Sequence, residues 1–160
     1  MKKNFYKDVK EAEVSEGIVV DYLSRQGYYV EDVRHLKNYQ TRSIDYVALA
    51  EQQVFTIEVK DDQKGHATGN FIIELTAGNG RPGWFKKCQA TTLAIVSKHE
   101  RIIFLLSMYE LKRYLNKHQN HLKHVTIRDF NEDGTFEAFD CVLIPRQMYE
   151  RSNSVIKISY

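Results

Sequence analysis

The sequence predicts an α/β (α+β) domain in which helices flank a mixed β-sheet, with additional strands in the C-terminal third. Three observations predict it: a helical repeat of apolar residues near the N-terminus, two pairs of apolar segments at hairpin spacing, and an amphipathic pattern after the second pair. With 160 residues, 42 % hydrophobic and 28 % charged, the chain has the length and composition of a single folded domain over residues 1–160.

The first predicted elements are a helix, a strand and a hairpin. Apolar residues at roughly helical spacing predict a helix over residues 8–26, and Gly27 is suited to end it. Tyr28–Arg34 then has the composition of a strand. The apolar segments Ser43–Ala50 and Val54–Lys60 are separated by three residues, so we expect them to pair as a hairpin.

The later elements follow from the same patterns. In chain order they are a strand over Phe71–Leu75, a short helix or turn over Trp84–Gln89, a second hairpin over Thr91–Ser97 and Arg101–Ser107, a helix over 108–119, and mainly strands from His124 onwards with a turn at 131–134.

Charge and cysteine content set broad limits on function. The net charge of +2 permits a polyanionic partner without requiring one. Two stretches, 76–89 and 112–128, contain basic residues and no acidic ones, which fits either phosphate contacts or solvated surfaces. Two distant cysteines and the lack of a signal-like or membrane-spanning apolar run predict a reduced, cytoplasmic protein with no membrane partner.

The triplet acid-any-Lys occurs four times, and only one occurrence lies on an apolar strand. Side chains alternate along a strand, so Glu58 and Lys60 should share one face of Val54–Lys60. Asp45 precedes Glu58 with twelve residues between them, and hairpin pairing would return it to Glu58. We therefore expect two carboxylates and a lysine at one end of the hairpin.

This grouping suits hydrolysis of phosphodiesters. Mg²⁺ prefers oxygen ligands and takes one or two protein carboxylates, with water and substrate phosphate as its other ligands. Asp45 and Glu58 are the candidate metal ligands for Mg²⁺, or for Mn²⁺ in its place, and Lys60 is the candidate catalytic cation. The alternative is a charged pair at the open end of a hairpin, with Asp45 capping a turn.

These residues make the chain resemble the PD-(D/E)XK nuclease superfamily. The resemblance is carried by Ser43-Ile-Asp45 and Phe55-Thr-Ile-Glu58-Val-Lys60, with Ile44 in place of the usual proline. It covers about residues 10–107 and leaves 108–160 as a C-terminal elaboration. It implies a restriction-endonuclease-like core and a metal-dependent endonuclease.

The first helix also resembles that of the Holliday-junction-resolvase-like members. Glu16, Leu23 and Gly27 match their spacing of a helical glutamate, a hydrophobic residue and a glycine before a strand. The resemblance implies that Glu16 is a fourth catalytic residue, which completes the metal site or steadies Lys60. Glu13, one turn earlier, is the rival, and both glutamates can also be ordinary solvated residues.

Candidate substrate-binding residues follow the motif strand. The stretches 68–74 and 83–85 resemble a phage or mobile-element branch of endonucleases, and the superfamily often places Gln or Lys on the next helix. Trp84 can stack on a base or be buried, and Glu74 can bind metal or pair with a lysine. The candidates for nucleic-acid contacts are Arg81, Lys86, Lys87 and Gln89.

The leading hypothesis is a magnesium-dependent endonuclease acting on DNA. Two alternatives stay open: a nuclease that acts on RNA, and a binding or assembly module that keeps the fold without turnover. Cleavage of both strands of a duplex would favour a homodimer. Zinc-protease HExxH and Walker-type phosphate loops do not occur in the sequence.

Overall fold

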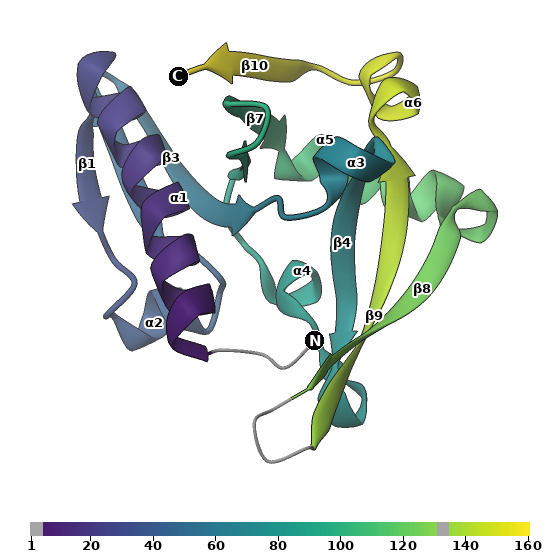
Figure 1. The fold of residues 1–160 in the computed structure, drawn as a ribbon. Coiled ribbons are helices and arrows are strands. Elements are labelled where there is room, and N and C mark those ends of the chain that lie inside the picture. The colour runs from purple at the N-terminus through teal and green to yellow at the C-terminus, as the bar shows by residue number, and fades with distance from the viewer. Residues whose placement is uncertain (1–4, 131–134) are drawn as a thin grey trace.

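The computed structural model describes residues 5–130 and 135–160, and the turn expected at 131–134 lies outside these ranges. Two sheets carry the fold (Figure 1). The helices are α1 (Phe5–Arg25), α2 (Lys37–Gln40), α3 (Gly65–Thr68), α4 (Trp84–Lys87), α5 (Met108–His118) and α6 (Arg146–Glu150), with 3-10 turns η1 (Gly78–Gly80) and η2 (Gln119–His121).

The larger sheet has six strands in the order β1-β2-β3-β6-β7-β10. Its strands are β1 (Tyr29–Asp32), β2 (Tyr46–Ala50), β3 (Gln53–Asp61), β6 (Thr92–Ser97), β7 (Ile102–Ser107) and β10 (Val155–Ser159). Only the β3–β6 pair is parallel among its described pairs, so the sheet is mixed, as the sequence predicts. Both predicted hairpins, β2–β3 and β6–β7, are confirmed.

The second sheet is antiparallel, and the sequence analysis did not separate it from the first. Its order is β5-β4-β9-β8, with strands β4 (Asn70–Ala77), β5 (Arg81–Pro82), β8 (Lys123–Phe130) and β9 (Phe136–Pro145). Figure 1 shows β4 in teal beside β9 in yellow-green, although they are far apart in the sequence. Local periodicity cannot reveal such a partner, which is why the expected strand at 71–75 had no assigned sheet.

Opposite faces of the six-stranded sheet bury two hydrophobic clusters. On one face, α1 packs Val19 and Leu23 against Ile57 and Val59 of β3. On the other, residues of β6 and β7 pack against α5 and the second sheet, including Phe71 of β4. The alternation predicted for β3 is therefore confirmed, and Glu58 and Lys60 lie on the face opposite α1.

Helix α1 ends as the sequence predicts. Gly27 has a φ of 86°, and the backbone N–H of Tyr28 donates to the carbonyl of Leu23 at 3.1 Å. This left-handed glycine closes the helix by satisfying a carbonyl of its last turn. In the described parts of the chain, no helix is long and apolar enough to cross a membrane.

The C-terminal third is integrated into both sheets. Strand β10 pairs with β7, and β9 pairs with β4. Helix α6 was not predicted, since the tail reads mainly as strands; its five residues follow Pro145 and are too few to show helical periodicity.

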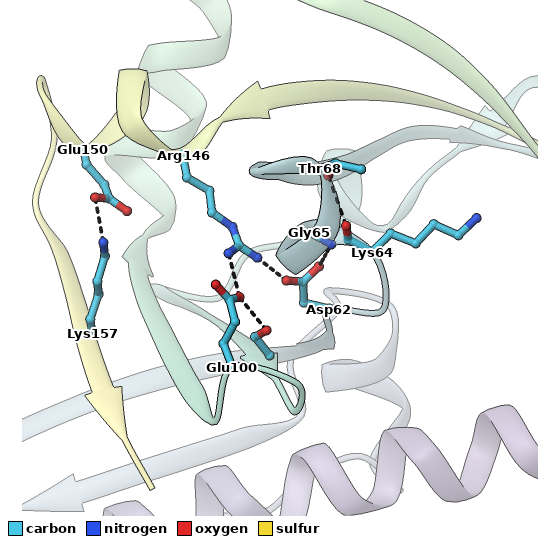
Figure 2. A network of polar contacts seen from close by, with 9 residues as sticks. Asp62, Lys64, Gly65, Thr68, Glu100, Arg146, Glu150 and Lys157 are labelled. Carbon is cyan, nitrogen blue, oxygen red and sulfur yellow. Dashed lines mark hydrogen bonds and ion pairs between the residues drawn. The ribbon is translucent and has the colours of Figure 1, made fainter.

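Arg146 of α6 ties this third of the chain to the end of β3 (Figure 2). Its guanidinium forms ion pairs with Asp62 and with Glu100, the latter at 2.7 Å, and its side chain is 9 % exposed. Gly65 leaves room for this contact, because a Cβ there would lie 2.4 Å from both Arg146 and Asp62. The segment that follows β3 is thereby fixed two residues after Lys60.

Candidate active site

The β2–β3 register brings Asp45 opposite Glu58. Tyr46 pairs with Ile57, and the backbone N–H of Asp45 donates to the carbonyl of Ile57 at 2.8 Å. The Asp45 carboxylate in turn accepts a hydrogen bond from the N–H of Val59 at 2.8 Å. The side chain of Asp45 is therefore held by the backbone of the strand that carries Glu58.

The turn before Asp45 is strained. Ser43 has a φ of 47°, in the left-handed region that side-chain-bearing residues rarely adopt. Its carbonyl accepts a bond from the buried Cys88 thiol at 3.3 Å, and the N–H of Ile44 donates to the carbonyl of Tyr39 at 3.1 Å. Such strain costs of order 1–3 kcal/mol and persists where surrounding contacts fix the backbone. Here the contacts fix the approach to Asp45.

Glu58 is buried because β3 is an interior strand, flanked by β2 and β6. The residue is 3 % exposed, and burial raises the pKa of its carboxyl, with a further increase from the neighbouring Asp45 carboxylate. The Lys60 ammonium acts in the opposite direction through an ion pair with one carboxylate oxygen, Oε1. The other oxygen, Oε2, is buried and accepts no hydrogen bond from any residue that the structure describes.

Lys60 remains a cation in this setting. Burial lowers the pKa of its ammonium, but the Glu58 carboxylate beside it outweighs that effect and raises it. Its Nζ lies 5.0 Å from the centroid of the Trp84 ring, within the range of a cation–π contact. The side chain is 35 % exposed, so the ammonium can reach a ligand from solvent.

Asp45, Glu58 and Lys60 line one pocket of about 290 Å³, as the hairpin prediction requires. Arg34, Gln40 and Trp84 complete its wall. The sequence analysis did not identify Arg34, in the turn after β1, or Gln40, at the end of α2, because neither belongs to a motif.

Glu16 lies near this group, outside the lining of the pocket. It sits on α1, across the sheet, and forms an ion pair with Arg34. Burial raises the pKa of its carboxyl; Arg34 and Lys60 act against this rise, and Asp45 adds to it. The rival Glu13 is exposed. Of the two glutamates, Glu16 is thus the one within electrostatic reach of the pocket, with Arg34 between them.

A metal ion at this pocket has two carboxylates available. Among residues 5–130 and 135–160, no group of three or more His, Cys, Asp or Glu is arranged to hold a metal. Two carboxylates suffice for Mg²⁺, which keeps several waters and binds substrate phosphate. The partnerless Glu58 Oε2 beside the Asp45 carboxylate is the kind of buried group that a cation would satisfy, so the residues fit the ion.

The predicted nucleic-acid-binding residues lie around α4, on the surface. Lys86, Lys87 and Gln89 are exposed; Gln89 follows the helix rather than belonging to it. Arg81 is exposed and 3.9 Å from Glu137 in an ion pair.

Among residues 5–130 and 135–160, Glu74 forms no ion pair with a lysine and does not line the pocket of Asp45 and Glu58. Its Oε1 accepts a hydrogen bond from the backbone N–H of Trp84 at 3.2 Å. Gly83 makes this close approach possible, because a Cβ there would lie 2.8 Å from Glu74 and 2.9 Å from its backbone carbonyl. The backbone of Trp84 is thereby fixed to β4, and its side chain lines the pocket.

The Cys88 thiol is a poor candidate for a nucleophile. Burial raises its pKa to about 11, so it stays protonated at neutral pH. The backbone carbonyl of Cys88 accepts a hydrogen bond from Lys112 Nζ at 2.6 Å. The residue supports the turn before Asp45 and does not carry chemistry.

Comparison with known proteins adds one resemblance. The sequence matches no protein-family model and no curated protein. The structure is similar to that of a bacterial homing endonuclease, I-Ssp6803I, with a TM-score of 0.47 and 13 % identity over 61 % of this chain and 67 % of the other.

Proposed function

We propose that this chain is a Mg²⁺-dependent endonuclease that hydrolyses phosphodiester bonds of DNA. The observation that carries the proposal is the buried Glu58 carboxylate with one partnerless oxygen, set between the Asp45 carboxylate and the Lys60 ammonium. A stable core has no need of such a group, whereas a site for a hard cation does. The resemblance of Ser43-Ile-Asp45 and Glu58-Val-Lys60 to the PD-(D/E)XK motif supports the same reaction.

Each residue has a role that its surroundings support. Asp45 and Glu58 would hold Mg²⁺ or Mn²⁺, which supplies polarisation of a phosphoryl oxygen and a more acidic bound water. Lys60 keeps its proton and offers positive charge where negative charge develops on the phosphate. Arg34 and Glu16 form an ion pair at the rim, which fixes a guanidinium beside the pocket.

Exposed cations near the pocket supply a surface for the phosphate backbone. Lys86 and Lys87 lie on α4, two and three residues after Trp84. A phosphate contact by either lysine adds salt-dependent affinity that does not depend on base sequence.

The test is cleavage of a panel of duplex, single-stranded and branched DNA and of RNA, with Mg²⁺ or Mn²⁺. We expect cleavage of DNA that EDTA stops and that Asp45→Ala, Glu58→Ala and Lys60→Ala each abolish while circular dichroism stays native. Glu13→Ala, which alters an exposed acid of α1, is the matched control and should cleave normally.

Two outcomes would replace the proposal. Cleavage of RNA alone would assign the same chemistry to another substrate. Nucleic-acid binding without cleavage, unchanged by Asp45→Ala and with no Mg²⁺ binding by calorimetry, would identify a binding module in which Glu58 and Lys60 are only a structural pair.

A further inference from the structure

A second cavity adjoins the pocket that holds Asp45 and Glu58. It has a volume of about 330 Å³ and lies where the segment after β3 faces the second sheet. Lys60 and Trp84 line both hollows, so the two meet at this cation–π pair. A molecule bound at the carboxylates therefore has a neighbouring space within reach of its next chemical group.

One side of this cavity is apolar. Ile72 of β4, Ile127 of β8 and Phe139 of β9 line it, and all three are half-buried. The register pairs Ile127 directly with Phe139, so the two side chains lie on the same face of the sheet. A volume of this size falls at the lower end of small-ligand sites, which span about 300–1,000 Å³.

The charges of the lining residues indicate which part of a nucleotide the cavity can accept. Four lining residues carry carboxylates (Asp61, Asp62, Glu74 and Asp129) and two carry ammonium groups (Lys60 and Lys64). Lys98 pairs with Asp61 and Arg146 pairs with Asp62, so the lining carries no excess of positive charge that would hold a phosphate. A flat, uncharged group with hydrogen-bond donors on its edge suits both the apolar walls and the carboxylates.

We propose that this cavity binds a single unpaired nucleobase, that of a nucleotide next to the scissile phosphate. The proposal rests on the proposed function, because the phosphate is placed at Asp45, Glu58 and Lys60. A base within a duplex is stacked and paired, and it must leave the helix to enter such a pocket. The enzyme therefore prefers DNA that offers an unpaired nucleotide at the cut, such as a bulge, a mismatch or a flap.

The test compares three kinds of duplex: fully paired, with one unpaired nucleotide next to the cut, and with an abasic analogue in place of that nucleotide. The unpaired nucleotide and its abasic analogue are placed in turn on each side of the cut. Stacking in an apolar site favours a base by about tenfold or more. We expect kcat/KM for the unpaired substrate to exceed that for the paired one by this factor. The abasic analogue should lose the advantage on one side of the cut.

Two variants address the cavity itself. Ile127→Phe fills it and Phe139→Ala removes one wall, and each should abolish the preference while the rate on paired duplex stays near that of the wild type. Phe136→Ala is the matched control, since Phe136 lies on the same strand with opposite parity and is 53 % exposed. If Phe139→Ala fails to fold, Ile127→Phe still decides the question.

The results separate this proposal from the one on which it rests. A preference that survives in Ile127→Phe, or an abasic substrate cut as fast as the intact unpaired one on both sides, overturns the base-binding cavity and leaves the nuclease intact. If wild type cuts none of the substrates, the proposed function fails. The cavity is then tested by fluorescence anisotropy with the same oligonucleotides, where equal Kd values for the unpaired and abasic forms overturn it.

Discussion

Replacing Asp45 with asparagine removes a charge from the carboxylate pair and keeps the shape of the side chain. The amide oxygen of asparagine can still accept the hydrogen bond that Val59 N–H donates at 2.8 Å. What is lost is the repulsion between Asp45 and the buried carboxylate of Glu58, together with an attraction between Asp45 and the Lys60 ammonium. The substitution therefore tests whether this site trades stability for metal binding.

The size of the effect follows from simple electrostatics. Two like charges about 4 Å apart repel by about 1 kcal/mol in water and about 4 kcal/mol at an effective dielectric constant of 20. The Lys60 ammonium already offsets part of this repulsion at Glu58. Without metal, we expect Asp45→Asn to raise the free energy of unfolding by about 1 kcal/mol, a rise in Tm of about 2–4 °C for a chain of this size.

With Mg²⁺ bound, we expect the wild type to be more stable than Asp45→Asn. At a free Mg²⁺ concentration of about 100 times Kd, binding stabilises the wild type by about 2.7 kcal/mol. Asp45→Asn loses a ligand and should gain much less. The assay is thermal unfolding in EDTA and in a Mg²⁺ series, with Glu13→Gln as an exposed acid-to-amide control. An Asp45→Asn protein that is less stable than wild type in EDTA, or that responds to Mg²⁺ equally, refutes the reasoning.

Two further predictions concern the supports of the site. Arg146→Ala should lower the free energy of unfolding by about 3 kcal/mol, because it leaves the buried carboxylate of Asp62 without its cation. Loss of the pair with the more exposed Glu100 adds less. Denaturant titration checks this, and Lys157→Ala, which breaks an exposed pair, should cost less than about 1 kcal/mol. Hydrogen bonds from the Thr76 and Thr126 hydroxyls lower the pKa of Asp140. The ionised carboxylate therefore stabilises the fold at pH values above the ordinary pKa of aspartate, and this contribution is lost as the pH falls through the lowered pKa. Thr126→Val removes one donor, should raise the Asp140 pKa in an NMR titration and should make acid unfolding less steep; an unchanged pKa would contradict the assignment.

Local pattern was enough to predict the elements that carry the candidate site. Helix α1, both hairpins and α5 each have a run of residues long enough to show its periodicity. Strand parity and the return of the hairpin then placed Asp45 with Glu58 and Lys60, and the register confirms that geometry. Short-range rules sufficed because these three residues lie within one hairpin.

The parts that sequence did not predict depend on long-range contacts. Helices α2, α3 and α6 have four or five residues each, too few for a periodic signal. The pairing of β4 with β9 and the contacts of Arg34 and Arg146 join segments remote in the chain. The expectation that Glu16 completes the metal site or steadies Lys60 remains a prediction, and the observed partner of Glu16 is Arg34.

The candidate active site and the second cavity draw on different parts of the chain: the β2–β3 hairpin carries the first, and the C-terminal third contributes walls of the second. The proposed hydrolysis needs few atoms at fixed spacing, and a strained turn at Ser43 with a buried Glu58 would provide them at a cost in stability. The proposed selection of an unpaired base needs surface beyond those atoms. The C-terminal third would supply it, because β8 and β9 contribute Ile127 and Phe139 to the second cavity. A chain cut after α5 would therefore lose walls of that cavity and Arg146, and with them both the proposed base preference and the anchor of the segment after β3.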